Sequence, residues 1–259
     1  MKGERIENQQ GHWVLAKMGK KVLRPGGKEL TLQMLQGLNI SEQDDVVEFA
    51  PGLGFTAKIT ISKNPKSYTA IELNEDAAMY LRKNVIKGEN RSVIIGNASA
   101  TTLENEVADK VYGEAMLTMQ TEKNKAKIIK EAYRILKPGG WYAIHEIVLE
   151  PESISKEDKD IIRRELARVI KVNARPLTEV EWTELLENEG FTDIKILKKP
   201  MHLLEPKRML DDEGIFRTLK IIFNVLTTPQ ARKRIFAMRK VFRKYEKNLD
   251  AIAIIAKKN

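Results

Sequence analysis

Cysteine is absent from the 259-residue chain, which excludes disulfide bonds, thiolate metal centres and cysteine nucleophiles. Histidine is scarce as well. The three histidines, His12, His145 and His202, lie far apart and lack the spacing of a zinc-protease helix or a zinc finger. We therefore expect no metal site, and the absence of cysteine suits a reducing compartment.

Long apolar stretches and an excess of acidic residues are also missing. The longest clean apolar stretch, residues 251–256, is far shorter than the ~18 residues that a membrane-spanning helix needs. Lys and Arg number 45 against 36 Asp and Glu, which gives a formal net charge of +9. With 42% hydrophobic residues the composition is that of a globular chain, so we expect a soluble, cytoplasmic protein.

What the chain does contain is an alternation of two patterns. Short β-branched runs are separated by helix-like segments, such as residues 74–87 and 122–136. The predicted strands are residues 45–49, 67–72, 92–96, 110–115 and 141–148. Such alternation predicts an α/β fold with a doubly wound sheet, in which parallel strands are joined by right-handed crossovers.

The flanking segments predict additions to this sheet. The N-terminal residues precede the first predicted helix and form an extension. Two further strands are predicted near residues 193–197 and 250–256, and the segment between them is too long for a hairpin loop and has the pattern of two helices. Residues 1–27 are the predicted N-terminal extension. The predicted core consists of residues 28–200 and 249–259, and residues 201–248 form a C-terminal helical insertion within it.

A glycine-containing turn joins the first predicted strand to the helix that follows it. The strand ends near Glu48, and Ala50, Gly52 and Gly54 follow. Glycine lets the backbone approach a ligand closely and leaves the helix N-terminus facing it. In an open α/β sheet this turn lies at the edge where ligands bind, and Glu72, at the end of the second strand, can accept hydrogen bonds from ribose hydroxyls.

Two ligand classes compete for this turn. Gly52, Gly54 and Ala57 also satisfy the G-x-G-x-x-A spacing of dinucleotide-binding proteins. A dinucleotide would place its pyrophosphate at the helix N-terminus, where the Glu48 carboxylate would repel it. The same carboxylate suits an ammonium or sulfonium group, so the charge favours S-adenosylmethionine.

The loop formed by Glu48, Ala50, Gly52 and Gly54 resembles the acidic-x-Gly-x-Gly-x-Gly motif of class I S-adenosylmethionine-dependent methyltransferases, with Ala50 in place of the first glycine. Residues 136–140, Leu-Lys-Pro-Gly-Gly, resemble the signature that precedes the fifth strand of that family. Residues 177–194 are similar to methyltransferases of ubiquinone and menaquinone biosynthesis. The resemblance spans about residues 44–199.

The resemblance implies a fold, a cofactor and the residues that hold it. The fold is a Rossmann-like, seven-stranded mixed sheet whose last strand runs antiparallel, and the cofactor is S-adenosylmethionine. Glu72 matches the ribose-binding acid, Asn97 and Ala98 match positions that contact adenine, and Glu114 lies where the family builds the floor of the site. The implied cofactor-binding residues are Glu48, Ala50, Gly52, Gly54, Glu72, Leu73, Asn97, Ala98 and Glu114.

Two pairs of residues are candidates for the acceptor side of the site. The family often has an acid at the position of Glu146, so His145 and Glu146 are candidate catalytic bases, although positioning alone can accelerate transfer from a reactive sulfonium. His12 and Trp13 lie in the extension, which in this family often folds over the cofactor, so we expect them to bind substrate. Ordinary packing is the alternative for each pair.

A basic amphipathic helix is predicted at residues 232–247, which contain eight Lys and Arg but one acid, Glu246. Its apolar side chains fall on one face, and we expect this face to pack on the insertion's other helix, residues 214–226. Peripheral contact with an anionic membrane is an alternative. Nucleic acid is disfavoured, because the aromatic residues lie on the apolar face and not among the basic ones.

We therefore predict an enzyme that transfers a methyl group from S-adenosylmethionine to a small-molecule acceptor, which the positive net charge suggests is anionic or lipid-like. The extension and the insertion are expected to cover the acceptor site. Three other functions stay open: an RNA or DNA methyltransferase that uses residues 232–247, a nicotinamide-dependent dehydrogenase, and a non-catalytic cofactor-binding protein. The sequence indicates neither the acceptor atom nor an oligomeric state.

Overall fold

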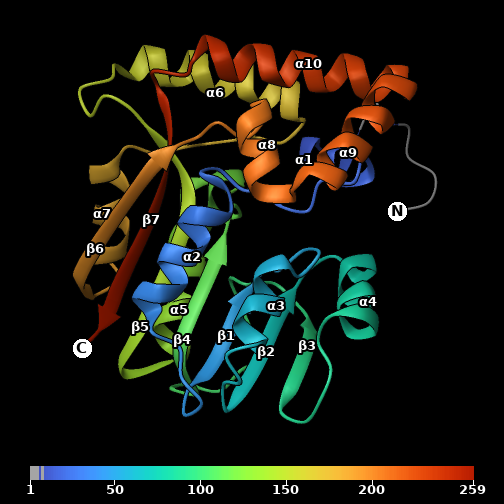
Figure 1. Ribbon diagram of the computed structural model, residues 1–259. Coiled ribbons are helices and arrows are strands. Elements are labelled where there is room, and N and C mark those ends of the chain that lie inside the picture. Colours follow the sequence, from blue (N-terminus) through green and yellow to red (C-terminus); the bar gives the residue numbers. More distant parts are fainter. Residues whose placement is uncertain (1–5, 7–8) are drawn as a thin grey trace.

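The computed structural model describes residue 6 and residues 9–259, and its centre is a seven-stranded sheet in the order β3-β2-β1-β4-β5-β7-β6 (Figure 1). Strands β1 to β5 pair in parallel, whereas β7 runs antiparallel to both β5 and β6. The predicted Rossmann-like mixed sheet is therefore confirmed. The strands are β1 (Asp45–Phe49), β2 (Ser67–Glu72), β3 (Arg91–Ile95), β4 (Ala108–Glu114), β5 (Leu136–Leu149), β6 (Phe191–Pro200) and β7 (Leu249–Lys258).

Helices cover both faces of the sheet. Alternate residues of a strand point to opposite faces, so Val46 belongs to the apolar cluster that includes α2, α3 and α4, and Val47 to the cluster that includes α5 and α7. This two-sided burial explains the nearly continuous apolar character of the central strands. The helices are α2 (Gly27–Leu38), α3 (Phe55–Ile61), α4 (Glu75–Asn84), α5 (Glu122–Ile135) and α7 (Glu179–Glu187).

Side-chain caps determine where several of these helices begin. The Asn74 side chain accepts a hydrogen bond from the backbone of α4, and Thr121 does the same for α5. Thr178 and Glu181 form a capping box at the start of α7, in which each side chain accepts from the other's backbone N–H. These local signals are visible in the sequence, which is why the helix starts were predictable.

A further group of helices lies across one end of the sheet, at the top of Figure 1. The prediction of two helices in the insertion is wrong, because there are three. Gly214, at φ +74°, separates α8 from α9, and Pro229 begins α10. This upper layer consists of α1 (Gly11–Lys17), α6 (Lys156–Ile170), α8 (Pro206–Glu213), α9 (Ile215–Thr227) and α10 (Pro229–Lys244).

The basic helix α10 does not pack as expected. Val241 of α10 and Tyr245, directly after the helix, lie in one apolar cluster with Ile162 and Leu166 of α6, so α6 is the main partner of α10. Only the first turns of α10, through Ala231, share a cluster with α9. The expectation of packing on residues 214–226 holds for that end alone, and most of α9 is left uncovered by α10.

The buried Trp182 tests how much α7 contributes to the fold. Its side chain is fully buried and its indole N–H donates to the carbonyl of Ile147 at 3.1 Å. We expect Trp182→Ala to lower the free energy of unfolding by about 3–5 kcal/mol, measured by urea denaturation. Val180→Ala, on the exposed side of the same helix, should change it by about 0.5 kcal/mol or less. Equal effects of the two variants would contradict this packing.

Candidate functional site

A cavity of about 620 Å³ lies between the carboxyl ends of the parallel strands and the upper helical layer. Its floor comes from the carboxyl ends of β1 to β5 and the loops after them, and its cover from α1, the segment after α6, and α10. The strand order reverses between β1 and β4, so the position matches the switch point at which open α/β sheets bind ligands.

The turn after β1 forms one wall of the cavity. Ala50 and Gly52 line it with φ of +51° and +58°, and no atom lies within 4 Å of a Cβ placed on Gly52. Gly54 is not among the lining residues. A Cβ on Gly54 would lie 2.6 Å from Leu81 of α4, so this glycine permits close packing behind the turn. The open space at Gly52 is the place where a ligand can approach the backbone.

Glu48 lies under this turn with its carboxyl group almost fully buried. The hydroxyls of Tyr68 and Tyr112 both donate to its Oε2 atom, the latter at 2.6 Å. Burial raises the pKa of Glu48 to about 7, although the two hydroxyl hydrogen bonds act in the opposite direction. A cationic ligand group in the cavity would favour the ionised form of this carboxyl.

Glu72, at the end of β2, connects the turn to the next loop. Its Oε2 atom accepts a hydrogen bond from the Gly52 N–H at 3.0 Å, and its Oε1 atom accepts from Asn74 at 2.9 Å. Each carboxylate oxygen can accept more than one hydrogen bond, so Glu72 retains capacity for a ligand. Leu73 lines the cavity beside it and is 68% exposed.

Asn97 and Ala98 line the cavity after β3. The Asn97 Oδ1 atom accepts hydrogen bonds from both the backbone N–H and the hydroxyl of Ser99, each at 3.0 Å. These contacts hold the carboxamide in one orientation. The structure thus brings both residues to the same cavity as Glu48 and Glu72.

Glu114 ends β4 and is the centre of a buried network. Its carboxylate accepts hydrogen bonds from four side chains, and burial, which raises its pKa, is outweighed by the charge of Arg24 and the His145 hydrogen bond, so the pKa falls to about 2. The carboxylate is therefore ionised at neutral pH. The donors are Arg24 of the extension, Thr31 of α2, Thr56 of α3 and His145 of β5.

Arg24 is a cavity residue that the sequence analysis did not select. Besides Glu114, it contacts the Phe55 ring, with its guanidinium carbon 4.9 Å from the ring centroid. The available signal was the run of basic residues that ends at Arg24, directly before Pro25 and Gly26. No pattern in the neighbouring residues indicated that this part of the extension lies against the edge of the sheet.

His145 and Glu146 do not present free groups to the cavity. His145 is fully buried and outside the lining, and its two ring nitrogens face Glu114 at 2.7 Å and the carbonyl of Pro25 at 2.6 Å. Glu146 lines the cavity, but its carboxylate accepts the backbone N–H groups of Met116, Leu117 and Thr118. Burial raises the pKa of Glu146. A base at either residue stays a prediction, and both side chains are held by hydrogen bonds within the protein.

His12 and Trp13, at the start of α1, form part of the cover. Both line the cavity, and their ring centroids are 4.9 Å apart. Burial lowers the pKa of His12 to about 4, so its imidazole is neutral at pH 7. A neutral histidine beside a tryptophan presents a largely uncharged surface to whatever occupies this end.

Most of the rest of the cover is apolar, although Gln10 and Lys21 also line the cavity. The extension and the insertion were expected to cover the acceptor site, but the apolar side chains of this wall were not selected from the sequence. Its side chains come from the extension, from the end of α6 and the residues after it, and from α10. The signal was the apolar face of residues 232–247, interpreted there as packing. The lining residues of this wall include Leu15, Leu23, Ile170, Val172, Met238 and Phe242.

Neither a metal centre nor a membrane span is found in the part of the chain that the structure describes. No group of three or more His, Asp or Glu residues among residues 6 and 9–259 is arranged to hold a metal ion. No helix within the same residues is long and apolar enough to cross a membrane.

Comparisons with known proteins agree with this geometry. Residues 47–144 match the family model of the methyltransferase domain. An uncharacterized protein of Haemophilus influenzae is 33% identical over 255 residues, which cover 97% of this chain and 99% of that protein.

Two solved structures share the fold. Phosphoethanolamine N-methyltransferase 2 of Haemonchus contortus, in complex with phosphomonomethylethanolamine and S-adenosylhomocysteine, has a TM-score of 0.72 and 16% identity. The match covers 96% of this chain and 57% of that one, so the chain spans little more than half of that enzyme. A cyclopropane synthase of Mycobacterium tuberculosis has a TM-score of 0.72 and 13% identity. That match covers 98% of this chain and 99% of the synthase.

The raised pKa of Glu48 predicts how stability depends on pH. The pKa is about 7 in the folded protein against an ordinary value of 4.5, so between these values the folded state binds more protons than the unfolded state. We expect the free energy of unfolding to fall as the pH rises from 4.5 to 7, with a Glu48 contribution of up to about 3 kcal/mol.

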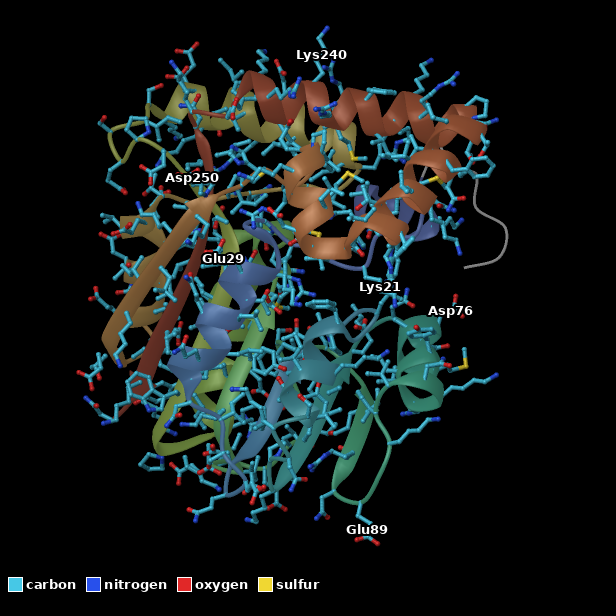
Figure 2. The ribbon with its side chains drawn as sticks, viewed as in Figure 1. Lys21, Glu29, Asp76, Glu89, Lys240 and Asp250 are labelled. Atoms are coloured by element: carbon cyan, nitrogen blue, oxygen red, sulfur yellow. The ribbon has the colours of Figure 1, made fainter. Side chains whose placement is uncertain are left out.

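Denaturant unfolding at several pH values measures this slope. Glu48→Gln keeps an oxygen that can accept from Tyr68 and Tyr112 and should show a flatter profile. Glu89→Gln, at an exposed acid at the bottom of the molecule in Figure 2, is the control and should keep the wild-type slope. Parallel profiles for wild type and Glu48→Gln would show that Glu48 does not titrate in this range.

Proposed function

Because the chain belongs to the class I S-adenosylmethionine-dependent methyltransferases, we propose that it transfers the cofactor's methyl group to a small molecule with an apolar body. The observation that carries the acceptor class is the division of the cavity. Carboxylates and the glycine turn line one side, whereas aliphatic, aromatic and methionine side chains line the other. An amphiphilic, lipid-like acceptor fits this second side.

The residues at the sheet edge suit S-adenosylmethionine. When bound, this cofactor supplies a methyl group made electrophilic by a sulfonium centre. Glu72, Asn97 and Ala98 all line the cavity. In this proposal Glu72 accepts hydrogen bonds from the ribose, and Asn97 and Ala98 contact the adenine. Glu48 and the open backbone at Gly52 suit the cationic amino-acid portion. The acidic lining also opposes a dinucleotide pyrophosphate, which argues against a dehydrogenase.

In this proposal, catalysis comes mainly from positioning and from exclusion of water. The upper helices cover the cavity, and the Glu114 network holds the extension against the sheet edge. An acceptor held in line with the reacting group needs little further assistance, because fixed orientation alone can provide large rate enhancements. His12 and Trp13 line the cavity, and in this proposal they contact the acceptor or shield the reacting groups from water. An anionic acceptor group would meet Lys21, which also lines the cavity.

A nucleic-acid acceptor has less support. Arg239 and Arg243 of α10 both pair with Glu205, and Lys244 pairs with Glu165. Arg234 donates to backbone carbonyl groups, including that of Val169. Much of the positive charge on α10 is therefore used within the protein, which leaves few of its cations for contacts along a nucleic-acid backbone.

The first test of this function is calorimetry with S-adenosylmethionine and S-adenosylhomocysteine, with NADH as the control. An acceptor screen with a labelled methyl group follows, comparing apolar and amphiphilic small molecules with RNA. Binding of the first two ligands together with methylation of an apolar acceptor supports the proposal. Binding without turnover on any acceptor would instead support a non-catalytic protein, and labelled RNA would support a nucleic-acid enzyme.

Glu72→Gln tests the placement of the ribose. We expect the affinity for S-adenosylmethionine to fall roughly ten- to a hundredfold, because hydrogen bonds to a charged group contribute about 1.5–3 kcal/mol. Glu75→Gln, an exposed acid in the first turn of α4, should leave the affinity unchanged. Calorimetry measures both variants, and unaltered binding by Glu72→Gln would place the ribose elsewhere.

Val172→Asp tests the apolar side with little risk to the fold, because Val172 is half-buried and lines the cavity just after α6. A carboxylate there should raise the KM for an apolar acceptor about tenfold or more, because a charge beside an apolar ligand must be desolvated. The affinity for the cofactor should not change. Asn173→Asp, on the exposed neighbour outside the lining, is the matched control. Equal KM values for the two variants would move the acceptor away from this wall.

A further inference from the structure

Helix α9 exposes a row of large apolar side chains. Phe216 is 91% exposed, and Phe223 and Leu219 are 65% and 59% exposed. These residues recur at intervals of three and four, so they share one face of the helix. We call this surface the α9 face, which consists of Ile215, Phe216, Leu219, Ile222, Phe223 and Leu226.

The opposite side of α9 holds the helix firmly on the protein. Ile221 is buried in a cluster with Val14 and Met18 of the N-terminal region. The Asn224 side chain donates to the Met18 carbonyl at 3.0 Å, and the Thr218 hydroxyl donates to the Met209 carbonyl at 3.0 Å. The α9 face is therefore fixed in an outward direction by contacts on its other side.

The charge around this face has one sign. Residues 214–245 contain nine Lys and Arg and neither Asp nor Glu. Lys220 and Lys233 are exposed, and among the described residues no carboxylate lies within ion-pair distance of either. Arg232 donates to the carbonyl of Leu226, which places a further cation at the end of the face. Lys240 points outward from α10 (Figure 2).

The apolar side chains of the α9 face and the cations around it together indicate which kind of partner can bind there. A second copy of the chain would bring the same cations against one another, which is unfavourable. An apolar helix face flanked by unpaired Lys and Arg is the arrangement of helices that lie in the interface of an anionic bilayer. There the apolar side chains enter the acyl boundary, and the cations contact lipid phosphates.

We propose that the α9 face docks on an anionic membrane surface, with Lys220, Arg232 and Lys233 as its phosphate contacts. The site differs from the one that the sequence suggested, because the apolar side of α10 is largely buried and that of α9 is not. The proposal concerns a binding surface and does not depend on the identity of the methyl acceptor.

Co-sedimentation of the full chain with vesicles tests the proposal. The protein should bind vesicles of phosphatidylcholine with phosphatidylglycerol and bind pure phosphatidylcholine much more weakly. The double variant Phe216→Ser, Phe223→Ser should reduce the partition coefficient at least about tenfold. Lys220→Glu with Lys233→Glu should reduce it roughly fivefold or more for each charge and weaken its dependence on salt.

Matched controls distinguish a specific effect of the α9 face from the effect of changing any exposed apolar or basic residue. Val180→Ser alters an exposed apolar residue on α7, and Lys130→Glu alters an exposed lysine on α5, so both should bind vesicles as wild type does. Circular dichroism and cofactor affinity confirm that each variant is folded. Vesicle binding that is absent in the wild type, or equal in wild type and the phenylalanine double variant, overturns the proposal. A dimer that this variant dissociates, without vesicle binding, also overturns it in favour of self-association.

Discussion

The organisation of the site depends on the hydrogen bonds and the ion pair that the buried carboxylate of Glu114 makes. An ionised group in the interior must be paired, and its partners come from the extension, α2, α3 and β5. Satisfying this one charge therefore fixes four separate elements around the carboxyl end of β4. Loss of a partner such as Arg24 would leave the charge uncompensated, which typically costs several kcal/mol.

Glu48 lies at the end of the neighbouring strand and has the opposite character. Its partners are two neutral tyrosine hydroxyls, and burial raises its pKa to about 7, while that of Glu114 is lowered to about 2. The negative charge of Glu114 is thus compensated by the protein itself, whereas the anionic form of Glu48 is only partly stabilised. A cation in the cavity would supply the missing compensation, which is the physical reason that a positively charged cofactor suits this edge better than a pyrophosphate.

Most of the sheet could be predicted from the sequence because its signals are local. Apolar runs, the turn after Glu48 and the capping box at Thr178 each involve residues within a few positions of one another. A cover made of the extension and the insertion was expected, but the side chains of the wall that contains Val172 and Met238 could not be predicted, because they come from segments far apart in the chain. Arg24 was missed for the same reason, since its partner Glu114 lies 90 positions away.

The helical layer shows how a correct local pattern can lead to the wrong surface. The pattern of residues 232–247 predicted a basic helix whose apolar side packs on the helix before it, so that both apolar sides would be buried. In the structure, Val241 and Tyr245 turn the apolar side of α10 onto α6, and α9 retains only one buried face, against Val14 and Met18. Amphipathicity specifies that a helix has an apolar side, but the partner is decided by tertiary packing. The exposed row on α9 is the consequence, and it explains why the outward surface of this layer is apolar on one helix and cationic on the next.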